Sequence, residues 1–132
     1  MLFAKEQIEA NYDYLILPTF TFNGHTYKVA PSPNEIKTWR EANDYCNGLT
    51  IGGYSDWRLP TEEELSYMCI EKESIGGFVI TAIEGNSIDL SYYWSSTAMG
   101  DQSHRAYYFI ECTYCGPFNY AQQNFRPIRV VE

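Results

Sequence analysis

Residues 52–61 read Gly-Gly-Tyr-Ser-Asp-Trp-Arg-Leu-Pro-Thr, and the other signals in the chain are arranged around this stretch. Glycine accepts backbone angles that side chains forbid, so Gly52 and Gly53 predict a tight turn. Trp57 and Leu59 are two residues apart, so both side chains point to the same side of an extended segment. The stretch therefore predicts an irregular loop that inserts a tryptophan and a leucine into the core.

A helix is predicted on each side of this loop. Residues 38–41 and 61–64 both begin with threonine and end with glutamate, the capping-box pattern in which each side chain satisfies a backbone donor of the first turn. Apolar residues follow both boxes at helical spacing, with Cys46 and Cys69 on the inner faces. The glutamates at 62–64 therefore indicate a capped helix start rather than a pair of carboxylates for acid–base chemistry.

Strand signals precede the first helix. Residues 12–17 are apolar and β-prone, and they predict a strand or a strand-like lead-in. Alternating runs on either side of Asn23-Gly24 predict a hairpin, because this dipeptide accepts the positive φ angles of a type I′ turn.

The second half of the chain is predicted to be rich in β structure. Strands are expected at 78–80, 92–97, 106–112 and 125–131. The two polar, aromatic-containing segments between the last three strands, 98–105 and 113–124, are expected to be loops.

Composition restricts the classes of function. The 132 residues fit one globular domain with a full core, and 17 acidic against 9 basic residues give a formal net charge of −8, which argues against a nucleic-acid partner. No segment has the ~20 apolar residues of a membrane span, and residues 1–10 do not resemble a signal peptide. Twelve tyrosines favour a surface that is both apolar and hydrated, as binding faces are.

The four cysteines leave several alternatives open. Cys112 and Cys115 could form a redox dithiol or a local disulfide, or remain loop thiols, and Cys46 could pair with Cys69 across the two helices. A zinc site made from all four is a further alternative. Loop thiols or a local disulfide are favoured, because the motif lies in a β-rich region without alternating β–α–β units. No metal, cofactor or catalytic residue is predicted.

Several segments together resemble the Lcl C-terminal domain family, named for a collagen-like bacterial adhesin. They are W-x-x-A-x-x-Y-C-x-x-L at 39–49, the loop at 52–61, YWSST at 93–97 and FRPIRVV at 125–131. Their order and spacing match over roughly residues 27–131.

This resemblance implies an α+β, C-type-lectin-like fold of the variety shared with the formylglycine-generating enzyme and with the variable proteins of diversity-generating retroelements. Two helices would pack on a small antiparallel sheet that carries long C-terminal loops. Residues 1–26 would be an N-terminal arm with the first hairpin strand, and 27–132 the ligand-binding domain of a single globular unit. The expected core comprises Trp39, Cys46, Trp57, Leu59, Leu65, Trp94 and Ile128.

The predicted function is noncatalytic recognition of a protein or glycan on a cell surface, in an adhesin or a diversified receptor-binding domain. A thiol redox or metal-site enzyme using Cys112 and Cys115, and a trimeric assembly module, are the alternatives. The resemblance also implies an extracellular, cell-surface or virion-surface location. The predicted ligand contacts are Asp101, Gln102, His104, Arg105, Tyr107, Tyr114, Phe118, Asn119, Tyr120, Gln122 and Asn124.

Overall fold

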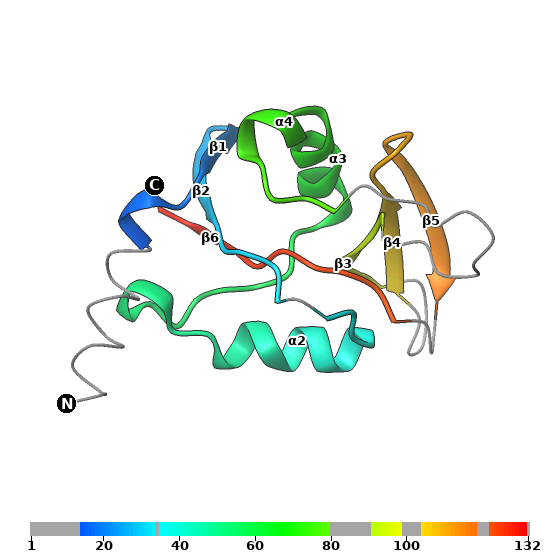
Figure 1. The fold of residues 1–132 in the computed structure, drawn as a ribbon, viewed down its shortest axis with the longest axis horizontal. Coiled ribbons are helices and arrows are strands. Elements are labelled where there is room, and N and C mark those ends of the chain that lie inside the picture. The colour runs from blue at the N-terminus through cyan, green and yellow to red at the C-terminus, as the bar shows by residue number, and fades with distance from the viewer. Residues whose placement is uncertain (1–13, 34, 80–90, 99–103, 119–121, 132) are drawn as a thin grey trace.

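The chain adopts an α+β fold with two small antiparallel sheets, as a computed structural model shows (Figure 1). The structure describes residues 14–33, 35–79, 91–98, 104–118 and 122–131, with only the backbone at 115–118. No helix in these ranges is long and apolar enough to span a membrane.

The first sheet contains β1 (Thr19–Phe22), β2 (His25–Val29) and β6 (Ile128–Val130), in the order β1-β2-β6. The predicted hairpin is confirmed: β1 pairs antiparallel with β2, and the turn residues Asn23 and Gly24 have φ angles of 54° and 81°. Because β1 shares a sheet with β2 and β6, the residues before position 27 that the structure describes belong to the same folded unit as the rest.

The second sheet contains β3 (Tyr92–Ala98), β4 (His104–Tyr108) and β5 (Thr113–Phe118), in the order β3-β4-β5. The strand predicted at 106–112 instead begins at His104 and ends in a turn, in which Cys112 has a positive φ of 55°. That turn reverses the chain, so the segment predicted to be a loop from 113 onward begins as strand β5.

Helix α2 (Trp39–Gly48) and helix α3 (Glu62–Ile70) both begin at the predicted capping boxes, which are confirmed. The short helices η1 (Ile51–Gly53) and α4 (Lys72–Ile75) follow α2 and α3 respectively.

Two predicted strands are wrong where the structure describes them. Residues 14–16 are helical rather than extended, and the Lys28 ammonium donates a hydrogen bond of 2.8 Å to the carbonyl of Tyr14, which stabilises this helical turn. Phe78 and Val79 form no strand, because the Val79 N–H donates to the Tyr93 hydroxyl instead of to a neighbouring strand.

The loop at 52–61 packs as predicted. Trp57 and Leu59 are only 2% and 1% exposed, and both glycines at its start have positive φ angles. Between the two buried side chains, the backbone of Arg58 exchanges two hydrogen bonds of 2.9 Å with Ile128. The loop is therefore joined to β6 as well as to both helices.

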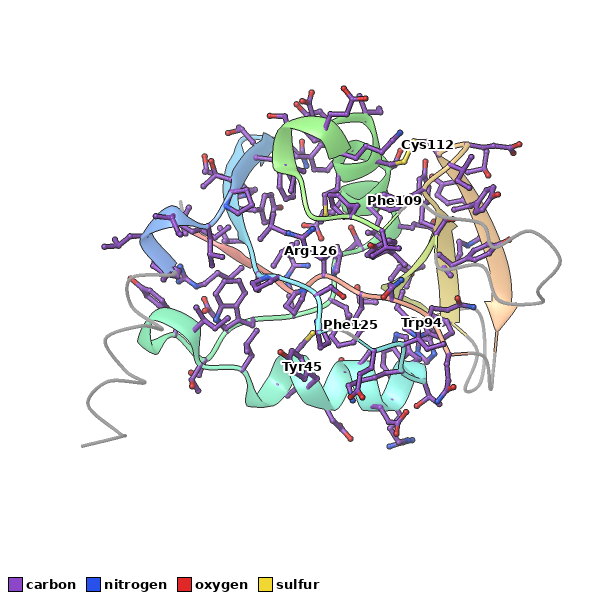
Figure 2. The ribbon with its side chains drawn as sticks, viewed as in Figure 1. Tyr45, Trp94, Phe109, Cys112, Phe125 and Arg126 are labelled. Atoms are coloured by element: carbon purple, nitrogen blue, oxygen red, sulfur yellow. A yellow bond between two sulfur atoms is a disulfide. The ribbon has the colours of Figure 1, made fainter. Side chains whose placement is uncertain are left out.

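The C-terminal segment 123–130 runs between the two sheets (Figure 1). Arg126 lies at its centre (Figure 2), where Nε donates to the Ala30 carbonyl and Nη1 to the Gly76 carbonyl, at 2.7 and 2.8 Å. Burial lowers the pKa of the Arg126 guanidinium to about 10. The guanidinium also lies 4.6 Å from the centre of the Phe78 ring. This buried cation therefore connects the C-terminal segment to the end of β2 and to the residues after α4.

Two clusters of buried side chains form the core. One includes Leu65, Met68 and Tyr107 and joins α3 to both sheets, and the other includes Cys46 and Trp94 and joins α2 to the second sheet. The predicted core is confirmed at Cys46, Trp57, Leu59, Leu65, Trp94 and Ile128.

Trp39 corrects that core prediction, because it is only partly buried at the edge of the α2 cluster. Its indole N–H donates to the Ser95 carbonyl at 2.8 Å, so the ring attaches the start of α2 to β3 from outside.

Candidate functional site

Helices α2 and α3 cover opposite faces of the β3-β4-β5 sheet. Trp94 and Ala106 contact the α2 cluster, whereas their neighbours Tyr93 and Tyr107 contact the α3 cluster. Adjacent residues of a strand point to opposite faces, so the alternation in β3 and β4 assigns one face to each helix. Tyr114 of β5 pairs with Tyr107 and lies at the open edge of the α3 face.

A surface groove of about 280 Å³ lies where α3, β1 and β5 meet. Its lining combines three aromatic rings with an aliphatic, a carboxylate and a hydroxyl side chain, from Phe22, Glu63, Ser66, Tyr67, Ile70 and Tyr114. Tyr114 is 50% exposed and Ile70 is 69% exposed, so apolar surface faces solvent at both of these residues.

The ring of Tyr114 is held in place although half of its surface is exposed. It packs edge-on against Tyr107 with 5.3 Å between the ring centres, and the Arg105 guanidinium lies 5.1 Å from the centre of the Tyr114 ring. Arg105 in turn forms an ion pair with Glu62, with Nε and Oε2 separated by 2.8 Å. A positioned ring costs little conformational entropy when a ligand contacts it.

A second groove, of about 460 Å³, lies beside α4 and is lined by Ile70, Glu71, Lys72, Glu73 and Ser74. Ile70 lines both grooves, so the two are neighbours on the surface. We call the two together the α3 groove.

The structure separates the predicted contacts into groups. Arg105 and Tyr114 lie together beside the α3 groove, whereas His104 stacks on Trp39 on the α2 side with 3.5 Å between ring centres. Burial lowers the pKa of the His104 imidazole. Gln122 is exposed. Four predicted contacts lie outside the described residues: Asp101, Gln102, Asn119 and Tyr120. Of Phe118 the structure describes only the backbone.

Two predicted contacts are corrected by their burial. Tyr107 is 4% exposed, and its hydroxyl donates to the Cys112 carbonyl inside the β4–β5 turn. Asn124 is 6% exposed, and its backbone pairs with β3. Both stabilise the fold and offer almost no surface to a ligand.

The part of the groove formed by Phe22, Tyr67 and Ile70 is not among the predicted contacts. These residues lie in a hairpin and a helix, whose patterns indicate scaffold. A signal was nevertheless present: Tyr67 and Ile70 are apolar residues beyond the inner face of α3, so they exceed what the core requires.

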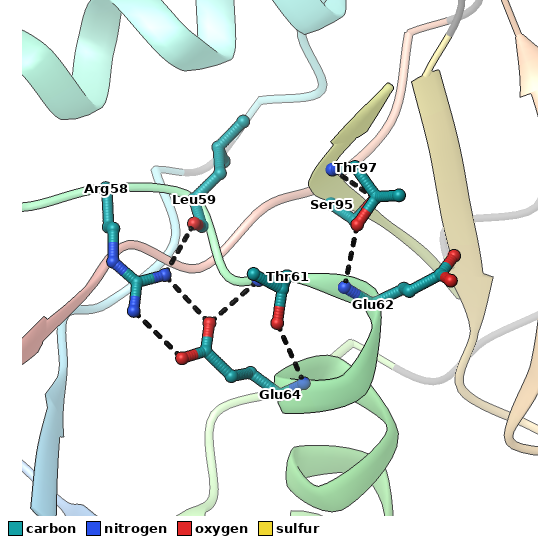
Figure 3. A network of polar contacts seen from close by, with 7 residues as sticks. All are labelled: Arg58, Leu59, Thr61, Glu62, Glu64, Ser95 and Thr97. Carbon is teal, nitrogen blue, oxygen red and sulfur yellow. Dashed lines mark hydrogen bonds and ion pairs between the residues drawn. The ribbon is translucent and has the colours of Figure 1, made fainter. Parts of the chain in front are cut away.

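A network of polar contacts fixes the start of α3 beside this groove (Figure 3). Arg58 binds both carboxylate oxygens of Glu64 at 2.8 Å, and Glu64 also accepts from the Thr61 N–H. The Glu62 N–H donates to the Thr97 hydroxyl, which attaches the helix to β3. Glu64 and Glu62 are thus both occupied in ion pairs, which supports the interpretation of residues 62–64 as a helix start.

We expect the Glu64 carboxylate to make stability depend on pH. Burial would raise its pKa, but Arg58, the Thr61 N–H and Tyr27 outweigh burial and lower the pKa to about 2. Since the folded pKa lies below the unfolded value, the stabilisation is complete above about pH 4.5 and is lost as pH falls toward 2. Because Arg58 is partly solvated, Glu64→Gln should lower the free energy of unfolding at pH 7 by about 1 to 3 kcal/mol.

Urea denaturation between pH 2.5 and 7 measures this effect. The matched control is Glu63→Gln, which changes an exposed carboxylate in the same helical turn and should alter stability by less than about 0.5 kcal/mol. Equal losses of stability in the two variants would show that the Arg58–Glu64 pair contributes nothing specific.

The cysteines pair in a way that the sequence did not predict. Cys69 of α3 forms a disulfide with Cys112 of the β4–β5 turn, so Cys112 is not available for a dithiol or a local disulfide with Cys115, and the four-cysteine zinc alternative is also wrong. Cys46 is a buried free thiol whose pKa burial raises to about 12. In the described part of the chain, no group of three or more potential ligand residues could hold a metal ion.

The fold and the α3 groove define a small α+β domain with an open aromatic groove at the edge of one sheet. The family model of the Lcl C-terminal domain matches residues 13–131, and the chain belongs to this family. The family suggests a surface-associated, non-catalytic domain and is not a known enzyme family. A comparison with curated proteins finds no match.

Proposed function

We propose that this domain recognises a protein or glycan on a cell surface without catalysis, and that the α3 groove is its binding face. The observation that carries the proposal is the half-exposed Tyr114 ring, which is positioned by protein contacts and opens onto a groove lined by further aromatic rings. Contiguous exposed apolar surface of this kind is typical of interaction sites, and tyrosine is enriched in them.

Two features support the wider context of this proposal. Helices on both faces of a small antiparallel sheet, together with the family, support a C-type-lectin-like fold. The Cys69–Cys112 disulfide supports an oxidising location such as the cell or virion surface, because disulfides persist outside the reducing cytosol. Trimeric assembly and diversification of the C-terminal region remain predictions.

Tyr114→Ala should weaken ligand binding while leaving the fold intact. The intact domain is first tested on an array of cell-surface proteins and glycans, and the affinity of each ligand found is then measured for the variant. Loss of a central aromatic contact should weaken binding about tenfold or more.

Tyr45→Ala is the matched control for this variant. Tyr45 is 36% exposed on α2 and packs edge-on against Phe125 with 5.3 Å between ring centres, the same spacing that separates Tyr114 from Tyr107. Ligands that bind both variants as tightly as the intact domain would place the binding face elsewhere.

A further inference from the structure

The charge of the α3 groove selects among ligands, and this inference rests on the proposed function of that groove. Its lining carries three carboxylates, from Glu63, Glu71 and Glu73, and one ammonium group, from Lys72. Within the described residues, none of the three carboxylates forms an ion pair. The Lys72 ammonium lies 3.9 Å from the sulfur of Cys112, at one end of the groove.

The preference for a cation comes from the side chains of the groove, which supply three carboxylates against one ammonium group. The helix ends add nothing to it, because Glu71 ends α3 and also begins α4, so the negative end of one helix adjoins the positive end of the next.

The aromatic part of the groove favours the same kind of ligand. Tyr67 and Phe22 lie 5.3 Å apart by ring centres, and with Tyr114 and Glu63 they line one site. The faces of aromatic rings attract Lys and Arg side chains, and a nearby carboxylate strengthens that attraction. An anionic ligand such as a sulfated glycan would instead meet an excess of negative charge.

We propose that the α3 groove binds an extended segment of a partner protein in which a lysine or arginine stands next to an apolar side chain. The apolar side chain lies against Ile70 and the aromatic rings. One cationic side chain of the segment lies beside Glu63, and a second lies beside Glu71 and Glu73, because these carboxylates stand at opposite ends of α3. The partner is therefore a basic protein segment rather than a glycan.

Fluorescence anisotropy with three labelled probes tests this proposal. The probes are a nonapeptide that alternates lysine, phenylalanine and glycine, the same peptide with glutamate in place of lysine, and the neutral sugar chitotriose. Only the lysine peptide should bind, and its affinity should fall as sodium chloride rises from 50 to 500 mM, because the charges are exposed.

Two variants localise that binding. Glu63→Gln combined with Glu73→Gln should weaken the lysine peptide about fivefold. Asp44→Asn removes an exposed carboxylate from α2 and should leave the affinity unchanged. Tighter binding of chitotriose or the glutamate peptide, no binding of the lysine peptide, or equal affinity in all variants would each overturn the proposal.

Failure of this inference differs from failure of the proposed function. If an array ligand depends on Tyr114 but the lysine peptide does not bind, the groove is the binding face and its ligand is not a basic segment. If array ligands bind the Tyr114→Ala variant normally, the groove is not the binding face.

Discussion

Trp57→Ala is expected to lower the free energy of unfolding by about 3 to 5 kcal/mol, which is a large fraction of the stability of a domain of this size. The indole is 2% exposed, so its removal leaves a cavity in the loop that joins both helices to β6. It also removes the N–H that donates to the Ile51 carbonyl at 3.2 Å. Thermal and urea denaturation followed by tryptophan fluorescence and circular dichroism measure the loss.

Two further variants separate the contributions of Trp57. Trp57→Phe retains most of the apolar volume but lacks the indole N–H, so its stability should lie between those of the intact chain and the alanine variant. Ser55→Ala changes an exposed residue of the same loop and should have an effect below about 0.5 kcal/mol. If Trp57→Ala remains as stable as the intact chain and loses only ligand binding, the loop is the binding site, and the structural role assigned to it is wrong.

Removing the Cys69–Cys112 disulfide should destabilise the domain by about 2 to 4 kcal/mol. The bond closes a segment of 43 residues, so it restricts the unfolded chain considerably. It also attaches the β4–β5 turn to α3, which holds Tyr114 against the α3 groove. We therefore expect the double variant Cys69→Ala, Cys112→Ala to lose ligand affinity as well as stability.

Urea denaturation with and without a phosphine reductant measures the effect on stability. Reductant should destabilise the intact chain and leave the double variant unchanged. The single variant Cys46→Ala serves as a comparison, because it removes a buried free thiol without opening a covalent bond. Equal stability of the intact chain under oxidising and reducing conditions would contradict the expected role of the disulfide.

The elements predicted correctly are those whose signals are local. The Asn23-Gly24 turn and the capping boxes at 38–41 and 61–64 depend on contacts within three or four residues, and all three are present. The helix at 14–16 was missed because Lys28, fourteen residues beyond Tyr14, supplies the hydrogen bond to its carbonyl.

The candidate site was predictable only in part. The sequence indicated the C-terminal half and included Arg105 and Tyr114, but it could not show that His104 lies on the other face of the sheet or that Tyr107 is buried. Tyr114 reaches α3 because residues 113–118 form strand β5. The sequence pattern indicates a loop there, and a loop does not predict that contact.

The loop at 52–61 separates the features that local sequence specifies from those that depend on tertiary packing. Spacing and local hydrogen bonds specify the hairpin, both helix starts and the inward positions of Trp57 and Leu59, and the order of the motifs identifies the family. The partner of Cys112, the burial of Arg126 and Asn124, and the lining of the α3 groove instead follow from the tertiary structure. Each of these requires segments tens of residues apart to meet, and the geometry of that meeting is set by packing rather than by local pattern.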